Sequence, residues 1–111
     1  MKRLIAVLTA VAIVAGVLAI PASGATKRVS VRDNVFAPKS ISIKRNDLIR
    51  FVWTGDNQHN VVTTRRPRGA ARVTIGTRRR GAVRKRFTRR GTYRLLCSIH
   101  APSMVMTVRV R

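Results

Sequence analysis

Apolar and polar side chains alternate with a period of two along most of the chain after residue 25. In residues 28–32 two valines alternate with arginine and serine, and in residues 48–53 Ile49, Phe51 and Trp53 share one face. Similar β-rich runs occur at residues 40–44, 61–64, 72–76, 93–97 and 104–111. A period of two with one apolar face is typical of half-buried β-strands.

Residues that favour turns separate these runs. Asn, Asp, Gly and Pro gather at residues 33–38, 45–47, 54–58, 66–69, 76–81 and 89–91. Six to eight short strands with regular turns predict one all-β domain, a sandwich or a barrel. The basic segment 65–94 allows either strands with charged outer faces or a long loop, and its apolar residues Val73, Ile75, Val83 and Phe87 favour strands.

The first 25 residues have the composition of an export signal. The basic start Met1–Arg3 precedes the apolar run Leu4–Ile20, and small residues with a proline follow it. We therefore expect a signal peptide over residues 1–25, cleaved after Ala25, and a domain over residues 26–111. The alternative is an uncleaved anchor, because the run is long for a signal core and short for a membrane span. Both predict export to the periplasm, the extracellular space or the outer face of the cytoplasmic membrane.

The expected domain is strongly basic. Residues 26–111 carry 22 lysines and arginines against three aspartates, a formal net charge of +19, and 13 of these basic residues lie in residues 65–94. Such a charge attracts an acidic redox partner or an anionic membrane or cell-envelope surface, although a merely solubilising surface has the same composition. Specific nucleic-acid binding is not expected, because residues 65–94 interleave only Phe87 and Tyr93 with the basic groups. We expect a monomer.

The residues able to bind a metal lie in two segments. Cys97, the only cysteine, precedes His100 by three residues and Met104 by seven, and the second histidine is His59. Two imidazoles, a thiolate and a weak thioether form the ligand set of a trigonal blue-copper centre. A Cys-x2-His spacing at the end of a strand allows one loop to present three of these ligands.

Each of these residues also has an ordinary interpretation. A lone cysteine is often a small core residue, a methionine often fills a gap in the core, and a histidine near a turn is often a surface group. A lone thiol in an exported protein also suggests an intermolecular disulfide. The same atoms would hold zinc, although structural zinc sites usually contain more thiolates or histidines in paired spacings.

Two long segments resemble the plastocyanin/amicyanin-like cupredoxins, the small type 1 blue copper proteins. They are "VSVRDNVFAPKSISIKRNDLIRFVWTGDNQHNVV" (residues 29–62) and "FTRRGTYRLLCSIHAPSMVMTVRV" (residues 87–110). The shared motifs are the "DNxFxP" turn, a strand ending in Trp, the "HNV" segment and "F…GTYxxxCxxH…M". The resemblance implies a Greek-key β-sandwich of about seven to eight strands, with copper at one end.

The resemblance also implies roles for particular residues. His59, Cys97 and His100 match the equatorial copper ligands, Met104 matches the axial ligand, and His100 would be the exposed edge where electrons leave. Asn60 and Ser98 match a pair that hydrogen-bonds across the two ligand segments and preorganises them. The chain departs from the family pattern in the length of the loop 101–103, in Asn46 in place of glycine, and in Met106, a weaker rival to Met104.

Three functions are compatible with the sequence. The first is a one-electron carrier that cycles between Cu(I) and Cu(II), without catalysis, because the chain has only three carboxylates and both histidines are candidate ligands. The second is copper binding for delivery or sequestration, which would use the same four residues. The third is a metal-free basic β-domain that binds polyanions.

Overall fold

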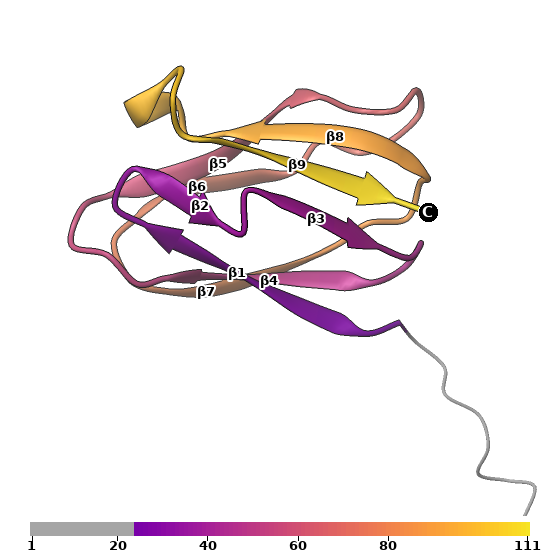
Figure 1. The fold of residues 1–111 in the computed structure, drawn as a ribbon, viewed down its shortest axis with the longest axis horizontal. Helices are drawn as coiled ribbons and strands as arrows, with labels where there is room; N and C mark the ends of the chain where they lie inside the picture. The colour runs from indigo at the N-terminus through magenta and orange to yellow at the C-terminus, as the bar shows by residue number, and fades with distance from the viewer. Residues whose placement is uncertain (1–23) are drawn as a thin grey trace, which may run out of the picture.

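The computed structural model describes residues 24–111, which form nine β-strands and one short 3₁₀ helix (Figure 1). The elements are β1 (Thr26–Arg32), β2 (Val35–Ala37), β3 (Ser40–Ile43), β4 (Leu48–Trp53), β5 (His59–Arg65), β6 (Thr74–Arg78), β7 (Gly81–Arg86), β8 (Gly91–Leu96), η1 (Ser98–His100) and β9 (Val105–Val110). The strands form two layers that face each other, so the predicted all-β sandwich is confirmed.

The two sheets combine antiparallel and parallel pairs. The four-stranded sheet has the order β2-β1-β4-β7, and the five-stranded sheet has the order β3-β9-β8-β5-β6. The pairs β1–β4 and β3–β9 are parallel, whereas the other pairs are antiparallel. Strands that follow one another in sequence therefore often lie in different sheets, which makes the connections cross from one layer to the other.

The apolar side chains of the alternating pattern form the core between the two sheets. Val29 and Val31 of β1 are fully buried, and so are Ile49 and Phe51 of β4, with Trp53 nearly so. The apolar face expected over residues 104–111 is also confirmed, since Met104, Met106, Val108 and Val110 are all buried. Burial of alternate side chains in two facing sheets removes apolar surface from water and stabilises the sandwich.

The basic segment 65–94 contains β6, β7 and the start of β8 and is not one long loop. Strand β6 pairs with β5, and β7 pairs with β4, while Val73, Ile75 and Phe87 are buried. Two of the expected turns nevertheless contain strand residues. Residues 76–78, expected in a turn, belong to β6, and the short strand β2 lies inside the expected turn 33–38 because it pairs with the edge of β1.

Most of the expected signal peptide lies outside the described residues, so its cleavage stays a prediction. Gly24 and Ala25 are described, and Ala25 donates its N–H to Asp47 and accepts the N–H of Leu48. Within residues 24–111 no helix is long and apolar enough to cross a membrane.

The sandwich has two ends that differ in chemistry. At one end β5 begins, β8 stops and β9 begins, and we call this the ligand end. We call the opposite end the far end. The ligand end carries η1, which Figure 1 shows away from the C-terminus. The far end carries the turn 44–47 between β3 and β4 and the last residue, Arg111.

Candidate metal centre

Cys97 enters the core because it continues the inward face of β8. Tyr93, Leu95 and Cys97 alternate along this strand, and all three are buried. The chain then turns through η1, where the N–H of His100 donates to the carbonyl of Cys97 at 3.2 Å. Two further main-chain bonds, from Met104 to His100 and from Cys97 to Met104, close the loop. Main-chain hydrogen bonds within the loop thus fix its conformation.

His59 is the first residue of β5 and is fully buried. Its carbonyl accepts the indole N–H of Trp53 at 3.0 Å. Its ring atom Nε2 lies 3.2 Å from Oδ1 of Asp33, which comes from the turn between β1 and β2. When Nε2–H donates to this carboxylate, Nδ1 carries the lone pair, and a second partner of this kind is what orients a liganding histidine.

Three candidate ligand atoms, from His59, Cys97 and His100, lie close together at the ligand end. Nδ1 of His59 and Nδ1 of His100 are 3.2 Å apart, and Sγ of Cys97 lies 3.9 Å from the first and 3.6 Å from the second. The three candidate ligand atoms all lie within 4.8 Å of one another. Nitrogen and sulfur donors bound about 2.0–2.3 Å from one ion are separated by about 3–4 Å, so this cluster fits a single metal ion.

Met104 lies at the level of the cysteine. The β8–β9 register pairs Leu96 with Val105, and its continuation pairs Cys97 with Met104, whose carbonyl accepts the N–H of Cys97 at 3.0 Å. Met106 pairs with Leu95, two residues deeper in the sandwich. Both methionines are buried. The register therefore favours Met104 over Met106 as the fourth donor.

Asn60 and Ser98 join the two ligand segments. Nδ2 of Asn60 donates to Oγ of Ser98 at 2.8 Å, and the N–H of Ser98 donates to Oδ1 of Asn60 at 2.8 Å. Each residue is next to a candidate ligand in the chain, so this reciprocal pair keeps His59 beside Cys97. The two residues expected to pair are thus hydrogen-bonded to each other.

Asp33 is the residue of this centre that sequence reasoning missed. Main-chain N–H groups of Asp56 and Asn57 donate to its carboxylate at 2.8–3.0 Å, and these bonds, with a smaller contribution from His59, lower its pKa from 3.8 to about 2. The sequence marked Asp33 only as a turn residue. No spacing links it to His59, because the contact forms only when the β1–β2 turn folds against the start of β5.

The burial of the cluster is uneven. Cys97 and His59 are inaccessible, whereas His100 is partly exposed and its neighbour Ile99 is 49% exposed. Burial of the thiol disfavours the intermolecular disulfide that a lone cysteine suggests. The site is closed on the side of the core and reaches the surface through one imidazole edge.

Comparisons with known proteins agree with this geometry. The family described as "Copper binding proteins, plastocyanin/azurin family" matches residues 25–111. A plastocyanin from Prochlorothrix hollandica is 31% identical over 122 residues, covering 98% of this chain and 93% of the relative. The solved pseudoazurin from Methylobacterium extorquens is 29% identical with a TM-score of 0.69, covering 77% of this chain and 74% of that one. The solved pseudoazurin from Hyphomicrobium denitrificans is 30% identical with a TM-score of 0.66 and the same coverage.

The donor set provides an independent test of the expected metal. One thiol with two imidazoles suits copper, because soft sulfur favours Cu(I) and imidazole accepts Cu(II). The four-residue set also lacks the paired thiolates or histidines usual in structural zinc sites. The chain therefore belongs to the plastocyanin/azurin family of copper-binding proteins, a cupredoxin whose cofactor is one copper ion.

Proposed function

We propose that this cupredoxin is an exported one-electron carrier whose copper is held by His59, Cys97, His100 and Met104. The convergence of one thiol and two imidazole nitrogens within 4.8 Å carries the proposal. Bound at these residues, copper supplies one-electron chemistry between Cu(I) and Cu(II). The family membership and the hydrogen bonds around the ligands support it.

The surrounding residues favour a site that changes little between the two oxidation states. The Asn60–Ser98 pair joins the ligand segments, and the Asp33 contact orients His59. Buried side chains exclude water from the thiol and from Met104. Ligands held in this way need little rearrangement when one electron is added or removed, which favours fast transfer.

His100 is the proposed exit for the electron, because it alone of the proposed ligands is partly exposed.

The proposed partner is acidic. Within residues 24–111 no lysine or arginine forms a salt bridge, so the positive charge of the surface is not neutralised internally. A complementary acidic partner would associate faster at low ionic strength. Catalysis is not proposed, since Asp33 and Asp47 already accept main-chain N–H groups.

The first experiment adds Cu(II) to the purified protein and records the absorption spectrum. We expect an intense thiolate-to-copper band that Cys97→Ser abolishes. Met104→Leu should alter the spectrum and the reduction potential, whereas Met106→Leu, the matched control, should leave both close to the wild type. A colourless wild-type protein whose melting temperature is unchanged by copper would contradict the proposed ligands.

The second experiment separates electron transfer from copper delivery. Reduced protein is mixed with an acidic cytochrome at low salt, and in parallel with an apo-protein that accepts copper. Electron exchange that slows as salt is added supports a carrier. Loss of copper to the acceptor without electron exchange would replace the proposal with delivery or sequestration.

A further inference from the structure

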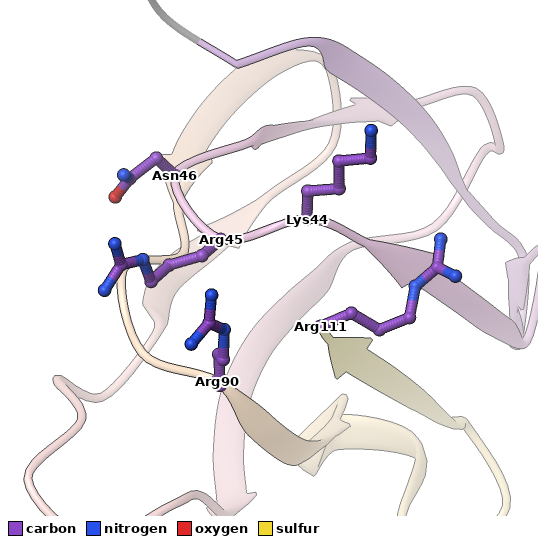
Figure 2. A pocket seen from close by; sticks show the side chains of 5 residues that line it. All are labelled: Lys44, Arg45, Asn46, Arg90 and Arg111. Atoms are coloured by element: carbon purple, nitrogen blue, oxygen red, sulfur yellow. The ribbon is translucent and has the colours of Figure 1, made fainter.

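The far end of the sandwich has a pocket of about 450 Å³ lined by cationic side chains. Figure 2 shows the five lining residues, Lys44, Arg45, Asn46, Arg90 and Arg111. They come from three parts of the chain: the turn between β3 and β4, the approach to β8, and the residue after β9. We propose that this pocket is a binding site for a phosphate group, separate from the metal centre.

The donors in the pocket suit an oxyanion of this kind. Three arginines supply planar forks of N–H donors, which match phosphate oxygens bidentately, and Lys44 adds a compact positive charge. In Figure 2 the guanidinium groups of Arg45 and Arg90 lie on one side of the view, and the ends of the Lys44 and Arg111 side chains lie on the other. None of these four cations forms a salt bridge within residues 24–111. Like charges that share one pocket repel each other, and a bound oxyanion relieves this repulsion.

The backbone beneath these side chains is fixed. The N–H of Arg45 donates to the main-chain oxygen of Arg111 at 3.0 Å, and the N–H of Asn46 donates to the carbonyl of Phe87 at 2.7 Å. Nη1 of Arg86 also donates to the carbonyl of Asn46 at 2.7 Å. The turn that carries two of the cations is therefore tied to β9 and to the segment before β8. The fold brings these residues to one pocket although they are up to 67 residues apart in sequence.

No acidic side chain lines the pocket. The nearest carboxylate in the turn, Asp47, is only 4% exposed. It accepts the N–H of Lys44 at 2.8 Å and that of Ala25 at 2.9 Å. Asp47 thus holds the turn, and its charge also attracts Lys44. Within residues 24–111 no carboxylate side chain forms a salt bridge with Arg45, Arg90 or Arg111.

The position of the pocket gives it a functional consequence. The pocket lies at the far end, whereas His100 reaches the surface at the ligand end. Strand β8 spans the distance between them, because Arg90 directly precedes this strand and Cys97 directly follows it. A phosphate group bound here leaves the metal centre accessible. If the phosphate belongs to a lipid headgroup, binding orients the ligand end away from the membrane.

The experiment measures binding of two probes at fixed ionic strength. Inorganic phosphate is followed by chemical-shift titration, and vesicles of phosphatidylglycerol are followed by co-sedimentation against phosphatidylcholine vesicles. The test variant is Arg45→Gln/Arg90→Gln, and the control is Arg79→Gln/Arg80→Gln, which removes the same charge from the exposed β6–β7 turn. Melting temperatures check that both variants fold.

We expect the test variant to bind at least about tenfold more weakly and the control to change less than about threefold. Arg45→Lys/Arg90→Lys should fall between wild type and the test variant, because it keeps the charge and loses the bidentate donors. Saturable binding of inorganic phosphate identifies a phosphate site, and binding of the vesicles alone with the same variant pattern identifies a lipid phosphate. No saturable binding of either probe, or an equal loss in test and control variants, would overturn the proposal.

Discussion

The reciprocal pair between Asn60 and Ser98 makes a quantitative prediction. Asn60→Ala removes both bonds, from Nδ2 to Oγ and from the Ser98 N–H to Oδ1. A neutral hydrogen bond contributes about 0.5–1.5 kcal/mol net, and water partly replaces exposed ones, so the loss should be about 1–2 kcal/mol. For a domain of this size that corresponds to a melting temperature lower by about 5–15 °C. Ser98→Ala removes only the hydroxyl bond and should cost about half as much.

The test is thermal unfolding of the metal-free protein for both single variants and for the double variant. Because the two side chains act through one pair, Asn60→Ala/Ser98→Ala should be little less stable than Asn60→Ala alone. Copper affinity should also fall by about tenfold in Asn60→Ala, because the ligand segments are then no longer held together before binding. Thr64→Ala, which removes a bond from Oγ1 to the carbonyl of Arg94 away from the cluster, is the control for affinity.

The reasoning would be refuted by a melting temperature of Asn60→Ala within about 1 °C of the wild type. It would equally be refuted if the losses of the two single variants simply added in the double variant. If Thr64→Ala weakened copper binding as much as Asn60→Ala, the effect on affinity would reflect general stability and not preorganisation.

Two further predictions concern stability. The pKa of Asp33 is about 2 in the folded protein and 3.8 ordinarily, so its carboxylate stabilises the metal-free fold above about pH 4, and this stability is lost as the pH falls through about 2. The melting temperature of Asp33→Asn should therefore fall less between pH 4 and pH 2 than that of the wild type, and equal slopes would contradict the assignment. Tyr93→Phe removes the bond from Oη to the carbonyl of Arg89 at 2.9 Å, and it should lower the free energy of unfolding by about 1 kcal/mol; an unchanged denaturant midpoint would show that water replaces this bond fully.

Much of the architecture was predictable from local patterns. Period-two alternation identified the buried faces of β1, β4 and β9, because a strand places successive side chains on opposite faces of a sheet. Asn46, which stands in place of the family's glycine, has a φ of 76°, a left-handed backbone conformation that asparagine tolerates. The short strand β2 was not predictable, because three residues show no period and the strand exists only through its pairing with β1.

The candidate ligands were also visible in the sequence, since the only cysteine and both histidines fall into segments that resemble a known family. Their chemistry follows from residue type alone. The sequence did not reveal the support of the site, however. Asp33 lies 26 residues before His59, and a hydrogen bond over that distance depends on where two turns meet.

The sequence by itself determined the strand faces, the donor atoms and the excess of positive charge. Only the tertiary structure decided that Asp33 meets His59, that Met104 and not Met106 lies level with Cys97, and that Lys44, Arg45, Arg90 and Arg111 share one pocket. The physical reason is that an alternation with a period of two residues reflects only the local geometry of the backbone. Contacts between distant segments depend instead on the order of the strands in each sheet and on their register. Those are properties of the whole packed sandwich, in which each strand is positioned by its neighbours.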